Sequence, residues 1–239
     1  MIPACPRTAH TGERGCNRLV VVVPAYNEER TIGGVVKCLL ARAAHVVVVD
    51  DGSTDATARR AEESGALVLR HIINRGQGAA LQTGIRFGLL LGADIIVTFD
   101  ADGQHDEADL AALIEPILQG ECEATLGSRF LGRAENIPRL RLVLLKLGVW
   151  FARLVSRMKV TDVHNGLRAF SARAARSLNI TMDGMAHASE VLEQVKASGL
   201  PYREVPVNIR YTRYSLDKGQ ANWNAVKIAS QLLLRKISR

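Results

Sequence analysis

The sequence contains few aromatic residues, few cysteines and no long apolar run. Aromatic residues make up 5% of the 239 residues and are not interleaved with the basic ones, which is not typical of a nucleic-acid-binding surface. The four cysteines form no CxxC pair and have no metal-ligand spacing. Residues 1–17 lack the apolar core of a signal peptide, and no uncharged stretch reaches the ~18 residues of a spanning helix. We therefore expect a cytoplasmic protein with no integral membrane segment and no nucleic-acid partner.

The charge balance favours an anionic partner. The net charge is +7, and the basic residues are concentrated toward the C-terminal half, which suits an anionic small molecule or lipid headgroups. A hydrophobic content of 47% with 23% charged residues is ordinary for a globular protein. We expect a flexible N-terminal tail over residues 1–17 and a single domain over residues 18–239.

Short apolar runs alternate with helical patterns through residue 99. The runs at 19–23, 45–49 and 95–99 are typical of buried strands, and the run at 67–69 indicates a further strand. The segments 30–43, 56–65 and 78–91 between them are typical of helices. This alternation predicts an α/β fold with a mainly parallel sheet and right-handed crossovers.

Polar clusters follow the four predicted strands. They are PAYNE (24–28), DDGSTD (50–55), NRGQG (74–78) and DADGQH (100–105). Because the carboxyl ends of parallel strands meet at one edge of a sheet, these acidic and glycine-rich turns indicate a phosphate and metal site. Asp100 and Asp102 lie two residues apart, so their side chains project the same way on a continuing strand. Such a carboxylate pair suits Mg²⁺ or Mn²⁺.

A dinucleotide-binding turn is the alternative for this edge, because Gly76 and Gly78 form a GxG after a strand. Leu81 occupies the position of the third glycine. The first predicted strand is followed by PAYNE, which has no glycine. The alternative therefore fails.

An ordered series of motifs resembles that of the family 2 glycosyltransferases. The motifs are VVVPAYNEE, VVVDDGSTDAT, NRGQGAAL, FDADGQHD, GSRF (127–130) and DVHNGLRAF (162–170). The sequence is most similar to the dolichyl-phosphate mannosyltransferase-like, polyprenyl-phosphate-linked branch, from about Leu19 to Gly219. The resemblance implies a GT-A fold, which is a Rossmann-like, mainly parallel sheet flanked by helices. It also implies inverting transfer of a sugar from a UDP- or GDP-sugar to a polyprenyl phosphate or another membrane-associated acceptor.

The resemblance also implies roles for residues of this sequence. The nucleotide-sugar donor would contact Pro24, Tyr26, Glu28, Asp51, Gly76 and Asp100. The metal would be bound by Asp100, Asp102 and Gln104, while Arg129 and Arg168 would face phosphates and Arg213 and Lys218 would lie in a late basic loop that closes on the donor. A metal ion and basic groups stabilise the charge that develops on a nucleoside diphosphate leaving group.

Two acidic residues, Asp162 and Glu190, are candidates for a general base if the acceptor is a sugar hydroxyl. A phosphate acceptor, with a second pKa near ~6, is already largely ionised at neutral pH and needs little help from a base. Asp162 would then orient Arg168 or the metal site. For His164 and His187 a structural hydrogen-bonding role is favoured over catalysis. A hydroxyl acceptor and a non-catalytic nucleotide-sugar-binding subunit stay open as alternatives.

Residues 139–158 combine an apolar helical pattern with a narrow basic stripe of Arg139, Lys146, Arg153 and Arg157. This pattern suits a helix lying in a membrane interface, and core packing or a contact within a homo-oligomer is equally compatible. Residues 222–237 indicate a C-terminal amphipathic helix. We expect peripheral attachment at the cytoplasmic face of a membrane. The QxxRW motif of processive relatives is absent from the sequence, which predicts one sugar per encounter.

Overall fold

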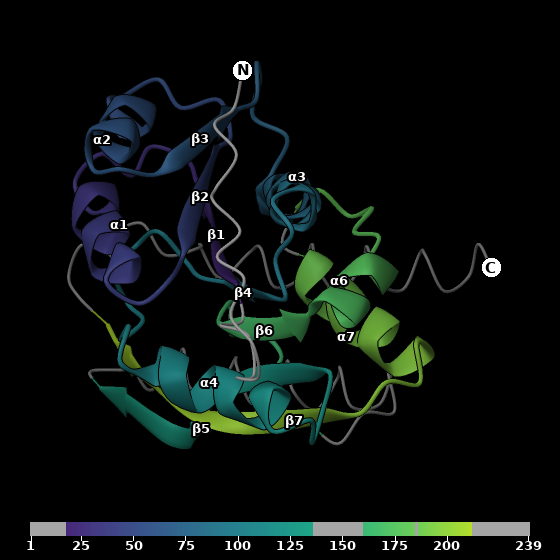
Figure 1. Cartoon of the computed structure of the whole chain (residues 1–239). Helices are drawn as coiled ribbons and strands as arrows, with labels where there is room; N and C mark the ends of the chain where they lie inside the picture. The colour runs from purple at the N-terminus through teal and green to yellow at the C-terminus, as the bar shows by residue number, and fades with distance from the viewer. Residues whose placement is uncertain (1–17, 136–159, 185, 212–239) are drawn as a thin grey trace, which may run out of the picture.

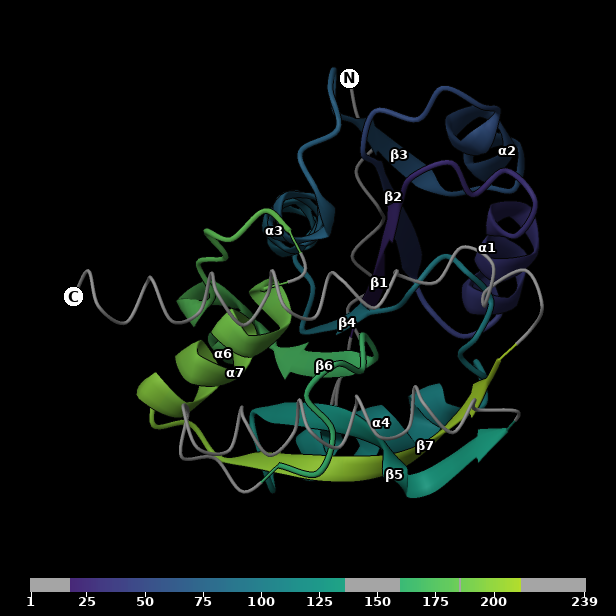
Figure 2. The same ribbon diagram turned by 180° about the vertical axis from the view of Figure 1, so that it is seen from behind.

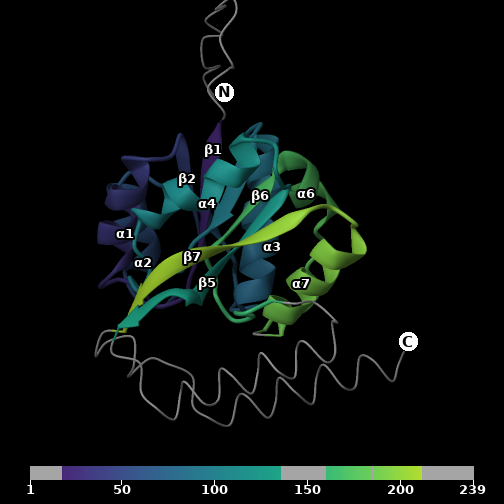
Figure 3. The ribbon, with the colours of Figure 1, turned by 90° about the horizontal axis from the view of Figure 1, so that it is seen from below.

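A seven-stranded sheet forms the centre of the molecule, in the order β3-β2-β1-β4-β6-β5-β7 (Figure 1). The computed structural model describes residues 18–135, 160–184 and 186–211. The strands are β1 (Leu19–Ala25), β2 (His45–Asp50), β3 (Leu67–Arg70), β4 (Ile95–Thr98), β5 (Ala124–Glu135), β6 (Arg168–Ser171) and β7 (Tyr202–Arg210). Strands β1 to β4 pair in parallel, and β6 is antiparallel to both β4 and β5. Strand β5 runs parallel to β7, beside it in Figure 3. The predicted mainly parallel α/β sheet is confirmed.

Helices cover both faces of this sheet (Figures 1 and 2). They are α1 (Ile32–Leu40), α2 (Thr57–Glu63), α3 (Gln77–Leu90), α4 (Asp109–Leu118), α6 (Ala172–Ser177) and α7 (His187–Ala197). All seven residues of β1 are buried, and its side chains alternate between the two layers. Val21 and Val23 pack in the core with residues of α1, α2 and α4. Val20 and Val22 pack with residues of α3, α6 and α7.

The strand predicted over residues 67–69 is present as β3, and it is covered less completely than the other three early strands. This strand pairs only with β2 at the edge of the sheet, and Leu67 is 39% exposed. An edge strand lacks a neighbour on one side and is covered less completely. The helix predicted over residues 30–43 is shorter in the structure than predicted: it begins at Ile32 and ends at Leu40.

Among the residues that the structure describes, no helix is long and apolar enough to cross a membrane. Several predictions lie outside the described residues. They concern the tail at 1–17, the basic-striped segment at 139–158, the late basic loop with Arg213 and Lys218, and the amphipathic helix at 222–237.

Candidate active site

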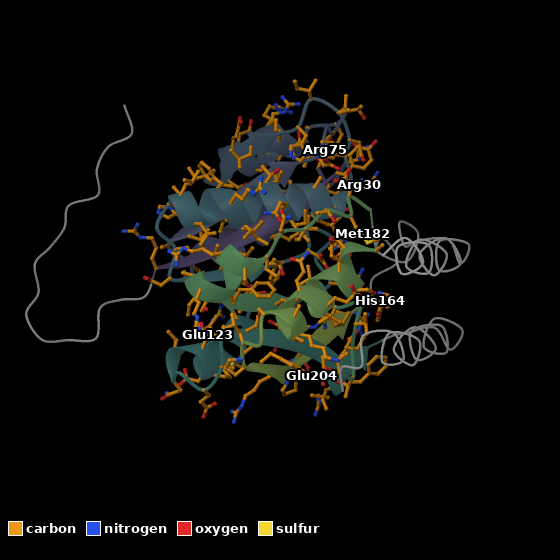
Figure 4. All side chains as sticks on the ribbon, turned by 90° about the vertical axis from the view of Figure 1, so that its right-hand side faces the viewer. Arg30, Arg75, Glu123, His164, Met182 and Glu204 are labelled. Atoms are coloured by element: carbon orange, nitrogen blue, oxygen red, sulfur yellow. The ribbon has the colours of Figure 1, made fainter. Side chains whose placement is uncertain are left out.

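A cleft of about 490 Å³ lies at the carboxyl ends of β1, β2 and β4. Its walls contain Pro24, Tyr26, Glu28, Asp51, Gly76, Asp100, Asp102, Gln104 and Arg129. Figure 4 shows how loops far apart in the sequence share this side: Arg30, Arg75, Met182 and His164 lie along one side of the molecule, whereas Glu123 lies on the other. The predicted convergence of the strand ends at one edge is confirmed.

The turns after β1 and β2 are tied to each other by hydrogen bonds. The backbone N–H of Asn27 donates to Ser53 Oγ over 2.9 Å, and Asn27 Oδ1 accepts from the backbone N–H of Thr54 over 2.9 Å. Asn27 has a φ of 53°, a left-handed conformation that asparagine adopts more readily than most residues. The neighbouring Tyr26 is consequently presented at the cleft with 45% of its surface exposed.

The carboxylate of Asp51 accepts hydrogen bonds from the backbone N–H groups in the glycine-rich turn NRGQG (74–78). Asp51 Oδ1 accepts from the N–H of Arg75 over 3.0 Å, and Oδ2 accepts from the N–H of Gly76 over 2.6 Å. These donors lie at the N-terminus of α3, where the helix dipole favours negative charge. An acidic side chain of the protein itself therefore accepts from the amides at this helix N-terminus.

The rest of the glycine-rich turn packs against the loop that precedes α7. The N–H of Gly78 donates to the carbonyl of Asp183 over 2.8 Å. A Cβ at Gly76 would lie 2.3 Å from the carbonyl oxygen of Asp183, and one at Gly78 would lie 2.0 Å from that of Met182. The amides of Gly76 and Gly78 thus bind protein groups, and the two glycines permit close backbone contact.

Asp100 follows β4 and is held from two sides. Its Oδ1 accepts from Gln77 Nε2 over 3.0 Å, and His105 Nε2 lies 2.9 Å from Oδ2. Gly166 leaves the space in which this carboxylate lies, since a Cβ there would come within 2.3 Å of Oδ2. Gly166, in the HNGLRAF segment, therefore makes room for Asp100 of the DADGQH segment, which lies 66 residues earlier in the sequence.

Asp102 and Gln104 form a local pair beside Asp100. The backbone N–H and the Nε2 of Gln104 both donate to Asp102, over 3.0 and 2.5 Å. Burial and the charge of Asp100 raise the pKa of Asp102. For Asp100, burial opposes the charged form, but the hydrogen bond and charge of His105 outweigh burial and lower the pKa. The two carboxylates therefore repel each other at neutral pH unless a positive charge lies between them.

This donor set fits a divalent cation that completes its coordination with other ligands. Within the described residues no group of three His, Cys, Asp or Glu side chains is arranged to hold a metal. Mg²⁺ and Mn²⁺ need only one or two carboxylates when phosphate oxygens and water supply the remaining ligands. Asp100 and Asp102 would hold such an ion, and Gln104 orients the second carboxylate.

Arg129 brings a positive charge to the cleft wall. Its Nε donates to Asp162 Oδ2 over 2.6 Å, and its Nη1 donates to Tyr211 Oη over 2.6 Å. Arg129 is 8% exposed; burial opposes its charge, but Asp162 and Tyr211 outweigh burial and raise its pKa. Arg129 therefore stays charged. Asp162 orients Arg129, rather than the Arg168 that the sequence suggested as its partner.

Arg168 does not line the cleft. Its Nη2 donates to the carbonyls of Val163 and Ala188, over 2.8 and 3.3 Å, and its Nε donates to the carbonyl of Asn165 over 3.1 Å. Burial lowers the pKa of Arg168 to about 10. The expectation that this guanidinium faces a phosphate is not supported by these contacts, since its hydrogen bonds cross-link the loop before β6 to α7.

Glu190 is also buried away from the cleft. It is 0% exposed, and its carboxylate accepts three hydrogen bonds, from the N–H and hydroxyl of Thr181 and from the N–H of Met182. A general base must reach the acceptor proton. Glu190 instead anchors the loop that packs on the glycine-rich turn, so its assignment as a base is not supported by its position.

The two histidines have the environment of structural groups. His187 Nδ1 lies 2.8 Å from the carbonyl of Gly184, and burial lowers the pKa of His187 to about 4. Burial also lowers the pKa of His164, which lies at the cleft wall. Both imidazoles are therefore neutral at pH 7.

Four residues that hold the site together were given no role from the sequence. Gln77 and His105 flank Asp100, His71 contacts Asp51, and Tyr211 contacts Arg129. The sequence gave a signal for Gln77 and His105, because they lie inside the NRGQG and DADGQH segments. His71 and Tyr211 lie outside the four polar clusters and far along the chain from their partners.

Comparison with known proteins identifies the family. Residues 20–177 match the model described as glycosyl transferase family 2, which is more than half of the chain. The chain belongs to glycosyl transferase family 2. The resemblance inferred from the motifs is confirmed, and the protein is a glycosyltransferase.

Curated relatives match nearly the whole length of this family 2 chain. An uncharacterized protein of Methanocaldococcus jannaschii is 40% identical, with 92% of this chain and 93% of that protein covered. The UDP-N-acetylglucosamine–dolichyl-phosphate N-acetylglucosaminyltransferase of Methanococcus voltae is 35% identical, with coverage of 92% and 97%. The polyprenol monophosphomannose synthase of Mycolicibacterium smegmatis is 27% identical, with coverage of 90% and 85%.

A solved structure supports the fold of this family 2 member. Glucosyl-3-phosphoglycerate synthase from Mycobacterium tuberculosis, crystallised with Mn²⁺, UDP and phosphoglyceric acid, superimposes with a TM-score of 0.73. It is 22% identical, with 93% of this chain and 78% of that chain covered. The likeness confirms the predicted GT-A fold.

Proposed function

We propose that this glycosyltransferase transfers a sugar from a UDP-sugar to a polyprenyl phosphate, with inversion and with a divalent cation held by Asp100 and Asp102. The observation that carries the proposal is the juxtaposition, in one cleft, of an acidic pair with the oriented guanidinium of Arg129. This is the arrangement that a diphosphate leaving group needs, because its charge grows as the bond to the sugar breaks. GDP-sugar is the alternative donor.

The relatives support the choice of substrates. The Methanococcus voltae relative is named for a UDP-sugar donor and a dolichyl-phosphate acceptor. The Mycolicibacterium smegmatis relative is named for a polyprenol monophosphomannose product. A lipid phosphate is thus common to both names, whereas the sugar differs.

Each part of the cleft has a role in the proposed reaction. Pro24, Tyr26, Glu28 and Asp51 form the part of the wall that would contact the nucleoside, and Gly76 shapes its floor. A divalent cation held by Asp100 and Asp102 would supply positive charge to the diphosphate. Arg129 donates to the same leaving group, and Asp162 keeps that guanidinium in place. A phosphate oxygen of the acceptor forms the new bond to the anomeric carbon as the bond to the nucleoside diphosphate breaks on the opposite face.

The burial of the two candidate bases favours a phosphate acceptor over a hydroxyl. Asp162 is ion-paired with Arg129, and Glu190 is bonded to Thr181 and Met182. A hydroxyl nucleophile needs a group that takes its proton, whereas an ionised phosphate does not. Both predicted carboxylates serve as positioning groups in this proposal.

We also propose peripheral membrane attachment, because a polyprenyl phosphate presents its headgroup at the membrane surface. Two isoleucines beside the cleft support it: Ile72 is 101% exposed and Ile73 is 67% exposed. They immediately precede Asn74, which lines the cleft. Apolar side chains at such a position suit insertion between lipid headgroups.

The proposed function is tested by identifying the product of the transfer reaction. Purified protein is incubated with Mn²⁺, UDP-N-acetylglucosamine or another UDP- or GDP-sugar, and either a polyprenyl phosphate in detergent or a soluble glycan acceptor. We expect mass spectrometry to detect glycosyl polyprenyl phosphate and free nucleoside diphosphate. Transfer only to the glycan hydroxyl would contradict the phosphate acceptor. Nucleotide binding with no turnover on any acceptor would support the non-catalytic alternative.

A further inference from the structure

His71 links the end of β2 to helix α3 beneath the nucleoside part of the cleft. Its backbone N–H donates to the carbonyl of Asp50 over 2.9 Å, which extends the pairing of β3 with β2. Its side chain is only 10% exposed. His71 Nδ1 lies 2.6 Å from Asp51 Oδ1, and Nε2 lies 3.0 Å from Thr83 Oγ1. Both ring nitrogens are therefore engaged, one with a cleft residue and one with α3.

The hydrogen-bond directions in this chain follow from the groups involved. An ionised carboxylate only accepts hydrogen bonds, so His71 Nδ1 must carry a hydrogen and donate it to Asp51. In the neutral ring Nε2 then accepts from the hydroxyl of Thr83. The hydroxyl thereby selects the tautomer that Asp51 requires.

Asp51 has almost all of its accepting capacity filled by the protein. It accepts from His71 Nδ1 and from the N–H groups of Arg75 and Gly76. A carboxylate has about four acceptor positions, so about one remains. Asp51 is 3% exposed yet lines the cleft, so the remaining position is directed by the three bonds already made.

We propose that His71 is a positioning residue for the donor nucleotide, which holds Asp51 so that its remaining acceptor position faces a ring N–H of the base. The inference rests on the proposed function, since it presumes a nucleotide donor in this cleft. Uracil and guanine both offer a ring N–H that donates to a carboxylate. Without the imidazole, the carboxylate of Asp51 would keep only its hydrogen bonds from the backbone N–H groups of Arg75 and Gly76. It would lose the link through His71 to Thr83 of α3.

Three variants separate the hydrogen bond from the volume of the ring. His71→Ala removes both contacts. His71→Asn retains a side-chain N–H near the position of Nδ1 and loses the contact with Thr83. Thr83→Val removes only the hydroxyl and keeps the side-chain shape. The control is His45→Ala, which changes a histidine at the opposite end of β2.

The readouts are calorimetric titration of UDP and of GDP in the presence of Mn²⁺, together with kcat and KM for the donor. We expect His71→Ala to weaken binding of the preferred nucleotide by ~10-fold or more, because a hydrogen bond to a charged group is lost. His71→Asn should stay within ~3-fold of wild type, and Thr83→Val should lose ~2- to 5-fold. The kcat at saturating donor should change by less than ~2-fold, since Asp51 contacts the base and not the reacting atoms.

The outcomes distinguish this inference from the proposed function. A nucleotide that binds wild type and His71→Ala equally would overturn the role of His71 alone. Equal losses in His71→Ala and His71→Asn would overturn it too, since they would show that ring packing matters and not the bond to Asp51. If His71→Ala fails to fold, Thr83→Val with unchanged affinity overturns the inference. If neither nucleotide binds the wild type, the proposed function fails and the inference fails with it.

Discussion

The carboxylate of Asp100 lies directly against the Cα of Gly166, so that a Cβ at position 166 would come 2.3 Å from Oδ2 and 2.4 Å from Oδ1. Gly166→Ala must therefore displace Asp100 from the bonds to Gln77 and His105. We expect Mn²⁺-dependent binding of UDP to weaken by at least ~10-fold, because the carboxylate can no longer meet the cation and its supports together. Calorimetric titration with and without Mn²⁺ measures the loss.

Gly34→Ala is the matched control, because nothing lies within 4 Å of a Cβ at that position of α1. Alanine is favoured over glycine in a helix by roughly 1 kcal/mol, so the control should be at least as stable as wild type. Wild-type affinity in Gly166→Ala would show that Asp100 is not needed where the structure holds it.

Asp102→Asn should stabilise the protein when metal is absent. Burial and the charge of Asp100 raise the pKa of Asp102, so the folded state binds this proton more tightly than the unfolded state does. Stability that is present at low pH is then lost as the pH rises through the raised pKa. Asparagine stays neutral, so at pH 7 in EDTA we expect a Tm higher by ~2–4 °C, the shift that about 1 kcal/mol produces in a protein of this size.

Thermal melts from pH 5 to 8 in EDTA test this, with Glu62→Gln as a control on the exposed surface of α2. Addition of Mn²⁺ should raise the Tm of wild type and leave that of Asp102→Asn nearly unchanged. A metal-free Asp102→Asn that melts below wild type would contradict the repulsion between the two carboxylates.

Glu190→Gln should lower the stability of the protein but should have only a small effect on kcat. The amide oxygen can still accept from the N–H groups of Thr181 and Met182, but the three hydrogen bonds lose their ionised acceptor, at a cost of about 1–3 kcal/mol. We expect a lower Tm, while kcat of the folded fraction falls by less than ~10-fold. Loss of a true general base would instead cost ~10²–10⁴-fold.

Glu193→Gln on the same helix is the control for this substitution. Melting curves and kcat at a temperature well below the transition are measured for both variants. A loss of kcat beyond ~10²-fold with an unchanged Tm would restore Glu190 as a catalytic candidate.

The sequence predicted the parts of the site that depend on local order along the chain. Strand ends are marked by apolar runs and the acidic turns that follow them, so Asp51, Asp100 and Asp102 were placed at one edge, and the structure brings them to one cleft. The identity of the partners depends on packing between distant segments. Nothing local shows that Gly166 receives Asp100.

The same reason explains why Arg168 and Glu190 lie elsewhere than expected. The family resemblance placed Arg168 at a phosphate, and Glu190 was a candidate base because it is a carboxylate. The loop before β6 and the loop at 178–184 supply carbonyls and amides that satisfy them. The glycines of NRGQG likewise had a conformational cause, the close approach of Met182 and Asp183, that competes with a phosphate for the same sequence pattern.

The double variant Ile72→Ser/Ile73→Ser tests membrane attachment. Ile72 and Ile73 are 101% and 67% exposed beside the cleft, whereas Leu90, at the other end of α3, is 84% exposed. A helix of this length spans ~20 Å. When the axis of α3 is steeply inclined to the membrane plane, the two isoleucines and Leu90 therefore cannot enter the same headgroup layer. Partial burial of two isoleucines contributes on the order of 1–3 kcal/mol, so the double variant should partition into anionic vesicles at least ~5-fold more weakly than wild type.

Leu90→Ser is the matched control, and co-sedimentation with phosphatidylglycerol vesicles is the measurement. UDP binding in solution should be the same in both variants, which confirms that the cleft is intact. The rest of the chain is identical in the two proteins, so any attachment through other segments cancels in the comparison. Equal partitioning of the two variants would mean that the isoleucines do not insert, and a loss confined to Leu90→Ser would place the opposite end of α3 at the lipid surface.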